Sequence, residues 1–293
     1  MLEKVRKMIV GSVLTLGLLL PFSVYASTLD VPTPINVVFS DQALAGAIAD
    51  ELGMLVTDEI TQIDLDAIID FHANNATISN LEGMQYLRNL EELFLNNNSI
   101  MDLTPIGNLE HLWHLSMPGN MIIDLSPLSN SYSLVSVWLV NNNIVDISPF
   151  ANLTNLETLG IAENFIVDIS SLADLTNLMS LHIASNRIED ISVLRYLTSV
   201  RSLDISHNYI CDVTPAEEML ELFDMFWVRN FGQTCQEETI TTEPPVTTTP
   251  TPPSNNVTYN PQTSVPNIAT NTAVAVGSLF ALLFINRKKK TVA

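Results

Sequence analysis

The sequence is poor in positive charge away from its two ends. Of its 12 basic residues, three lie within the first seven positions and four within residues 287–290, which leaves five arginines and no lysine between Ser27 and Asn286. The same stretch holds 31 of the 32 acidic residues, so its formal net charge is 5 − 31 = −26. A surface of that sign repels phosphate, which disfavours nucleic acid and anionic membranes as partners. A cationic partner, or simple solubility outside the cell, suits it better.

Patterns for catalysis and metal binding are also scarce. The chain has two cysteines, no Cys/His pattern at metal-ligand spacing and no glycine-rich phosphate loop. His182 and Asp204, with serines nearby, superficially suggest a hydrolytic triad. An open sheet face, however, supplies neither an oxyanion hole nor a water-excluding pocket. We therefore expect a protein that is not an enzyme and needs no metal ion or other cofactor.

What the sequence does contain is one pattern, LxxLxxLxLxxNxIxDLSPLxx, that occurs six times between Leu87 and Glu218 at a constant spacing. The copies begin at Leu87, Leu109, Ser131, Leu153, Leu175 and Leu197. This spacing predicts an α/β fold of the leucine-rich repeat type, a solenoid in which the LxL segments form a curved parallel sheet. The Ser/Thr-Pro pairs are expected to start 3₁₀ or helical turns on the convex side, with the Ser or Thr as cap residue.

Two polar ladders run through the repeats. One is made of asparagines, at Asn98, Asn120, Asn142, Asn164, Asn186 and Asn208. The other is made of aspartates, at Asp102, Asp124, Asp146, Asp168, Asp190 and Asp212. We expect each buried asparagine amide to satisfy backbone groups at its turn, and each aspartate to accept hydrogen bonds from its own turn. Calcium binding by the stacked carboxylates is the less favoured alternative.

The flanking segments are predicted to export, cap and attach the array. Residues 1–26 are typical of a secretory signal peptide, for which a membrane helix is the alternative. Before the repeats, one helix is expected between a cap at Ser40 or Asp41 and Gly53, and a second within residues 58–69. The full order is signal peptide 1–26, helical N-terminal cap 27–70, one degenerate and six full repeats 71–218, C-terminal cap 219–238, Thr/Pro-rich spacer 239–259 and sorting signal 260–293.

The C-terminal cap is bracketed by the two cysteines, Cys211 and Cys235. In an exported protein they can close this segment as a disulfide, which would add about 3 kcal/mol in the chain-entropy account. Two unpaired thiols are the alternative. Between the cysteines, residues 216–223 are expected to cover the final repeat as a helix.

The last part of the chain holds Asn260-Pro261-Gln262-Thr263-Ser264, an apolar run over residues 273–285 and the basic cluster 287–290. It resembles the cell-wall sorting signal of Gram-positive bacteria, and the pentapeptide is similar to the NPxT-type motif of class B sortases. The resemblance implies cleavage between Thr263 and Ser264 by a sortase, attachment to peptidoglycan, and only transient membrane contact through the tail. A second pentapeptide at residues 265–269 and an uncut membrane anchor are the alternatives.

The cap sequence FSDQALAGAIADELG, the segment LEGMQYLRNLEEL and the evenly spaced repeats together resemble the internalin family of secreted and wall-attached proteins, over roughly Ile35 to Glu218. The resemblance implies protein binding by the concave face and a location at the cell surface. The immunoglobulin-like module that many relatives carry is not evident. Four apolar residues stand where the family often has a small polar one: Met101, Ile123, Val145 and Val167.

The concave face carries the functional prediction. Its outward positions, on the strands and the turns after them, mix aromatic and apolar residues with polar ones, as binding hot spots do. The predicted partner-binding residues are Phe94, Met121, Trp138, Val140, Phe165, His182, Arg187, Asp204 and Tyr209. We expect an adhesion or protein-binding module secreted to the cell wall. The alternatives are a structural component of the wall or surface layer, and a glycan-binding protein whose aromatic residues stack on sugars.

Overall fold

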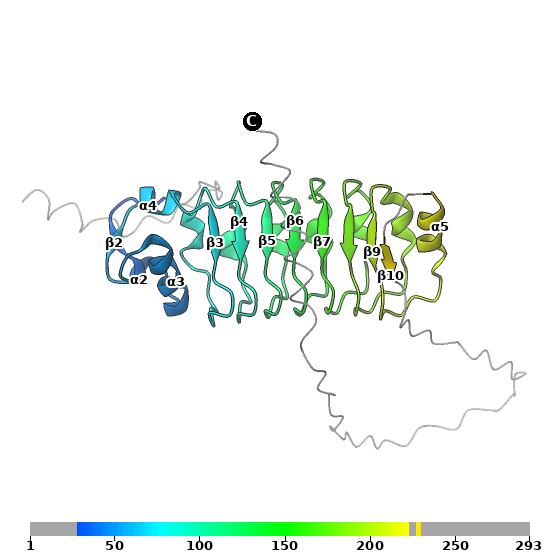
Figure 1. The fold of residues 1–293 in the computed structure, drawn as a ribbon, viewed down its shortest axis with the longest axis horizontal. Helices are drawn as coiled ribbons and strands as arrows, with labels where there is room; N and C mark the ends of the chain where they lie inside the picture. Colours follow the sequence, from blue (N-terminus) through cyan, green and yellow to red (C-terminus); the bar gives the residue numbers. More distant parts are fainter. Residues whose placement is uncertain (1–27, 223–226, 230–293) are drawn as a thin grey trace, which may run out of the picture.

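The computed structural model describes residues 28–222 and 227–229. This part of the chain is an elongated solenoid in which eight short strands stand side by side along the long axis, with helices at both ends (Figure 1). The predicted leucine-rich repeat solenoid is confirmed. The signal peptide, the spacer, the sorting signal with Thr263 and Ser264, and Cys235 lie outside the described residues. In the described ranges, no helix is long and apolar enough to cross a bilayer.

All eight strands are parallel, and each pairs with its neighbour in the order β10-β9-β8-β7-β6-β5-β4-β3. The register follows the sequence repeat, so that Leu93 pairs with Leu115 and Leu115 with Val137. The strands are β3 (Asp70–His72), β4 (Glu92–Phe94), β5 (His114–Ser116), β6 (Ser136–Trp138), β7 (Thr158–Gly160), β8 (Ser180–His182), β9 (Ser202–Asp204) and β10 (Trp227–Arg229). Strand β10 was not predicted, because it joins β9 through backbone pairing and its sequence lacks the repeat pattern.

The core is a continuous column of buried apolar side chains, mostly aliphatic, that runs from the N-terminal cap to Met219. In strands β3 to β9 the central residue, such as Leu93, points into this column and is fully buried. Opposite the sheet lie short 3₁₀ turns, as predicted: η1 (Met84–Tyr86), η2 (Thr104–Ile106), η3 (Ser126–Leu128), η4 (Ser148–Phe150), η5 (Ser170–Leu172) and η6 (Ser192–Tyr196). Each repeat therefore buries its apolar face only by stacking on its neighbours.

The asparagine ladder joins neighbouring repeats. Asn142 shows the pattern: its Nδ2 donates to the carbonyls of Leu139 and Met117 at 3.1 Å each, and its Oδ1 accepts from the backbone N–H of Ile122 at 3.0 Å. Met117 and Ile122 belong to the preceding repeat. The same three kinds of bond recur at every asparagine of the ladder. The prediction that the amides satisfy the turns is confirmed, and the bonds also hold adjacent repeats in register.

The aspartate ladder caps the 3₁₀ turns. Asp146 Oδ1 accepts from the backbone N–H of Ser148 at 2.8 Å, and the equivalent bond occurs at all six aspartates. The prediction that each aspartate accepts from its own turn is confirmed. The prediction that the Ser or Thr is the cap residue is wrong, because Ser148 is already the first residue of η4 and the cap position is held by Ile147. The Ile147 side chain is buried in the core, so the preceding aspartate supplies the acceptor.

The N-terminal cap contains both predicted helices, α3 (Gln42–Leu52) and α4 (Gln62–Asp66). Helix α3 is capped at its start by Asp41, whose Oδ1 accepts from the N–H groups of Ala43 and Leu44, and at its end by Gly53, with φ +65°. The other carboxylate oxygen of Asp41 accepts from the backbone N–H groups of Ser79 and Asn80, which links the cap to the first turns of the array. A one-turn helix and a two-stranded sheet were too short to predict: α2 (Ile35–Val38), β1 (Thr33–Pro34) and β2 (Glu59–Ile60).

The C-terminal end is covered by helix α5 (Thr214–Leu222), which was predicted to start two residues later. Its buried residues Ala216 and Met219 pack on the last repeat, and Arg195 Nε of η6 donates to Glu218 Oε2 at 2.7 Å. Cys211 is exposed at the turn before this helix. Its pairing with Cys235 stays a prediction, since Cys235 lies outside the described residues.

Candidate binding faces

The outward side chains of the repeats form two faces. The strand face is the outer side of the sheet, made by the first and third residues of each strand. The edge face is the outer side of the segment after each ladder asparagine, made by the residues one and three positions beyond it. Segments of the edge face are hydrogen-bonded in register, as where Phe165 N donates to Ile144 O at 2.9 Å. Equivalent residues of neighbouring repeats therefore lie beside one another.

The predicted binding residues are divided between these faces. Phe94, Trp138, His182 and Asp204 lie on the strand face, and Val140 lies just beyond the end of β6. Met121, Phe165, Arg187 and Tyr209 lie on the edge face and are exposed.

Phe94 is the centre of an aromatic stack on the strand face. Its ring centroid lies 4.2 Å from that of His72 and 4.8 Å from that of His114, so three neighbouring strands contribute one ring each. Phe94 itself is half-buried, whereas His114 is only 3% exposed. Burial, with a smaller contribution from the positive charge of His72, lowers the pKa of His114 from 6.5 to about 4. His114 is therefore neutral at pH 7.

Trp138 also lies on the strand face, but the expectation that it is exposed is wrong. Its exposed fraction is 6%, because its ring covers Gly160 of the next strand: a Cβ at Gly160 would lie 2.3 Å from Trp138 Cε3. The ring stacks on His182, one strand further on, with centroids 5.4 Å apart. Its Nε1 donates to Ser136 Oγ at 3.2 Å. A glycine at an outward strand position beside a tryptophan is the sequence signal for this packing.

His182 and Asp204 are nearly buried as well, with 8% and 9% of their surface exposed. His182 Nε2 lies 2.9 Å from Ser180 Oγ in the same strand. Asp204 Oδ1 accepts from Ser206 N at 3.1 Å and from Ser206 Oγ at 2.6 Å. These contacts fix both side chains in the floor of the strand face. Their role in binding a partner stays a prediction.

The edge face holds many of the exposed apolar residues of the array. Met121 is 47% exposed and Phe165 and Tyr209 are 40% exposed, and the Arg187 guanidinium carbon lies 4.8 Å from the centroid of the Phe165 ring. A row of four further residues, each more than half exposed, was not among the predicted site residues: Met101, Ile123, Val145 and Val167. Their signal in the sequence is an apolar residue between the buried isoleucine and the exposed aspartate in each of the first four repeats.

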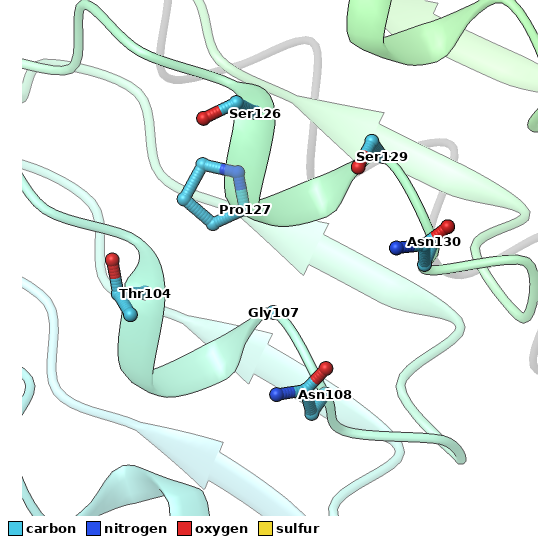
Figure 2. Close-up of a pocket in the computed structure, with 7 residues that line it drawn as sticks. All are labelled: Thr104, Gly107, Asn108, Ser126, Pro127, Ser129 and Asn130. Atoms are coloured by element: carbon cyan, nitrogen blue, oxygen red, sulfur yellow. The ribbon is translucent and has the colours of Figure 1, made fainter. Parts of the chain in front are cut away.

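A shallow groove lies on the opposite side of the molecule, between η2 and η3, and holds about 270 Å³ (Figure 2). Its lining offers hydroxyl and amide groups but no ionisable side chain: Thr104, Gly107, Asn108, Ser126, Pro127, Ser129 and Asn130. The two turns pack closely here, since a Cβ at Gly107 would lie 2.4 Å from the Pro127 carbonyl oxygen. In the part of the chain that the structure describes, no three His, Cys, Asp or Glu side chains are placed to hold a metal ion.

Family models match two parts of the chain. Residues 24–66 match the model described as "Bacterial adhesion/invasion protein N terminal", and residues 154–210 match a leucine rich repeat model. Among curated proteins of Listeria monocytogenes, Internalin C is 44% identical over 73 residues, 25% of each chain. Internalin H is 47% identical over 68 residues, 23% of this chain and 12% of that protein. The chain thus matches a quarter or less of the length of these curated relatives.

Solved structures of two internalins from the same species extend the likeness to about 70% of this chain. Internalin C2 is 37% identical, with a TM-score of 0.58, over 70% of this chain and 100% of that one. A second internalin, inlF, is 31% identical, with the same TM-score of 0.58, over 71% of this chain and 74% of that one. Since the likeness exceeds 30% identity and covers at least 74% of both internalin structures, the chain belongs to the internalin family of leucine-rich repeat proteins.

Proposed function

We propose that this protein is a secreted, wall-anchored adhesion module that binds a protein partner through the strand face of its repeats. The observation that carries the proposal is the aromatic floor of that face, with Phe94 and Trp138 as its largest members. Residues 1–26 direct export in this proposal, and residues 239–293 act as spacer and sorting signal, with Thr263 joined to peptidoglycan after the cut before Ser264.

The packing of the floor favours binding over catalysis. Phe94 lies between two imidazoles, and the Trp138 ring lies over Gly160 and against His182, so the conformations of these rings are set before a partner arrives. A surface ordered in advance loses less side-chain entropy on binding than a flexible one does. Aromatic residues in such a setting are the usual anchors of protein interfaces.

The net charge of this protein indicates the sign of the charge on its partner's surface. The net charge of −26 between Ser27 and Asn286 favours a partner with a basic surface, and long-range attraction of that kind raises the rate of association.

The test uses Phe94→Ala as the strand-face variant and Tyr132→Ala as its matched control. Tyr132 is an exposed aromatic residue, at 52%, outside both faces. Trp138→Ala is unsuitable, because the loss of a buried ring would also destabilise the fold. The labelled exported chain and both variants are titrated onto host extracts, bacterial surface extracts and a glycan array.

Saturable capture of a single protein that Phe94→Ala weakens by about tenfold, and Tyr132→Ala leaves unchanged, supports the proposal. If Phe94→Ala and Tyr132→Ala bind the captured protein equally well, the strand face is not the binding surface. Saturable binding to glycans alone would favour the glycan-binding alternative, in which the aromatic residues stack on sugar rings. If no saturable ligand appears in any arm, a structural role in the wall becomes the better explanation.

A further inference from the structure

We propose that the edge face of the first four repeats is a second docking surface, which binds a cationic amphipathic helix of a partner protein. The apolar side of that helix would lie along Met101, Ile123, Val145 and Val167, here called the edge stripe. Its lysine or arginine side chains would face the neighbouring aspartate ladder. This surface is separate from the strand face of the proposed function.

The edge stripe is continuous because the segments that carry it are hydrogen-bonded to each other. Met121 N donates to Ile100 O at 2.9 Å, and the same bond recurs at residues 143 and 165. Segments paired in this way lie about 4.8 Å apart, so the three steps from Met101 to Val167 cover roughly 14 Å. The members are 51–55% exposed, although the isoleucine just before each is buried. Exposed apolar surface of this kind on a water-soluble fold marks an interaction site.

The stripe is limited to four repeats, and polar or small residues take the equivalent position on both sides of it. The equivalent residue is Ser79 before the first full repeat, Glu189 in the fifth and Cys211 in the sixth. The backbone follows the same course at Glu189 as at Val167, since both follow the hydrogen-bonded isoleucine of their repeat. An apolar side chain is therefore not needed to form the turn. Four in succession indicate a discrete surface rather than a folding constraint.

The charge beside the stripe indicates the partner's chemistry. Each stripe residue is followed directly by an exposed ladder aspartate, and no lysine or arginine occurs between Arg88 and Arg187. Hydrogen bonds from the backbone and hydroxyl of the following serine lower the pKa of Asp124 and of Asp168, so both are ionised at neutral pH. A row of carboxylates along an apolar stripe repels acidic segments and anionic lipid, and attracts lysine or arginine.

The spacing of the stripe fits a helix better than an extended strand. A helix offers one apolar contact per turn of about 5.4 Å, close to the step of about 4.8 Å between repeats. A strand laid along the stripe would offer side chains on one side only at intervals of about 6.6 Å, and would fall out of step within two repeats. A helical segment of about ten residues spans the whole stripe.

The probe for the test is a synthetic peptide of about 18 leucine and lysine residues with leucine at helical spacing, beside a scrambled peptide of the same composition. Binding to the full exported chain is measured by fluorescence anisotropy. The stripe variant is Ile123→Thr/Val145→Thr/Val167→Thr, which keeps β-branching and removes apolar surface. Its control is Val37→Thr in the N-terminal cap, at a valine that is 65% exposed. We expect the stripe variant to bind about tenfold more weakly and the control to bind as wild type.

A second variant, Asp124→Asn/Asp146→Asn, removes charge but keeps an oxygen that can accept the turn bond. It should weaken binding several-fold and reduce the dependence of affinity on salt. Phe94→Ala should bind the patterned peptide as tightly as wild type, which would show that the edge stripe and the strand face are separate sites. Failure of one proposal then leaves the other unaffected. The proposal is overturned if the scrambled peptide binds as tightly as the patterned one, or if the stripe variant binds the patterned peptide like wild type. Either result would mean that the peptide binds by general charge attraction and not through the apolar stripe.

Discussion

The strand face and the edge face are built from outward positions of the same repeats, but the side chains of the two faces differ in how closely they pack on their neighbours. On the strand face the large rings reach across neighbouring strands, so that Trp138 covers Gly160 and stacks on His182. On the edge face, Val145 and its equivalents are too short to cover one another and remain more than half exposed. One repeat pattern therefore carries an interlocked surface and an open one.

An outward position in these repeats is thus not always an exposed one. Trp138 points away from the core, yet its burial gives it a part in stability. Val145 has the same aliphatic character as the core residues but contributes little to the folded state, because water reaches it. Mutations at the two faces should therefore separate stability from recognition.

Asn142→Ala breaks the buried polar ladder and should have the greatest effect on stability. It leaves the N–H of Ile122 without its acceptor and removes one donor from each of the carbonyls of Met117 and Leu139. These carbonyls keep their bonds from Asn120 and Asn164, respectively. The unsatisfied N–H costs about 1–3 kcal/mol and each of the two lost hydrogen bonds about 0.5–1.5 kcal/mol, so the variant should lose roughly 3–5 kcal/mol of unfolding free energy. Urea unfolding followed by far-ultraviolet circular dichroism measures it. A loss below about 1 kcal/mol would show that the ladder is not a structural requirement.

Acidification tests the strand face without a mutation. The pKa of His114 is lowered to about 4 from an ordinary value of 6.5, so the unfolded chain takes up a proton before the folded chain does. Stability that is fully present above pH 6.5 is then lost as the pH falls toward 4, by up to about 3 kcal/mol. Urea midpoints at pH 7 and 4.5 measure the change. His114→Gln should remove that part of the slope, and an identical slope in the variant would contradict the burial of this imidazole.

Gly160→Ala tests the contact that locks Trp138. The added methyl would lie 2.3 Å from the ring, so the indole must move, at a cost of about 1–3 kcal/mol. The displaced ring should become more exposed and its fluorescence should shift to longer wavelength. In Trp138→Phe/Gly160→Ala the smaller ring leaves room for the methyl group. The double variant should therefore lose less unfolding free energy than the sum of the losses in the two single variants. Full additivity would mean that the two residues do not contact each other.

Asp146→Ala is the counterpart of Asn142→Ala at an exposed site. Its hydrogen bonds to the backbone and hydroxyl of Ser148 cap η4 in contact with water. Loss of such a cap costs about 1 kcal/mol, well below the loss expected for the buried asparagine of the same repeat. The same urea titration applies, with Asp146→Asn as a control that retains an acceptor. Equal losses for Asp146→Ala and Asn142→Ala would contradict the distinction between the exposed and the buried ladder.

The parts of the fold that follow the repeat period could be predicted from the sequence. The leucine pattern indicated the sheet, the asparagines indicated buried turns, and Asp41 and Gly53 marked the ends of the first helix. All of these depend on local spacing and on residue types with one dominant use. The structure agrees with each of them.

What depends on contacts between repeats could not be predicted in the same way. The burial of Trp138 is decided by a glycine in the next repeat, and the burial of His182 by the ring that stacks on it. Strand β10 arises from backbone pairing that leaves no side-chain pattern. The edge stripe was not predicted as a site, because the sequence does not show that the strands and the turns after them present two separate faces. Its residues are apolar where the family often has a small polar residue.

The sharpest test of the difference between the two faces compares the unfolding free energies of Trp138→Ala and of Ile123→Thr/Val145→Thr/Val167→Thr, measured together in urea. Trp138→Ala removes a ring that is 6% exposed and should lose about 3 kcal/mol or more. The three edge substitutions together should lose less than about 1 kcal/mol, because the side chains they replace are already in water. Similar losses for the two variants, or a larger loss for the edge variant, would show that the strand face is not the interlocked surface described above.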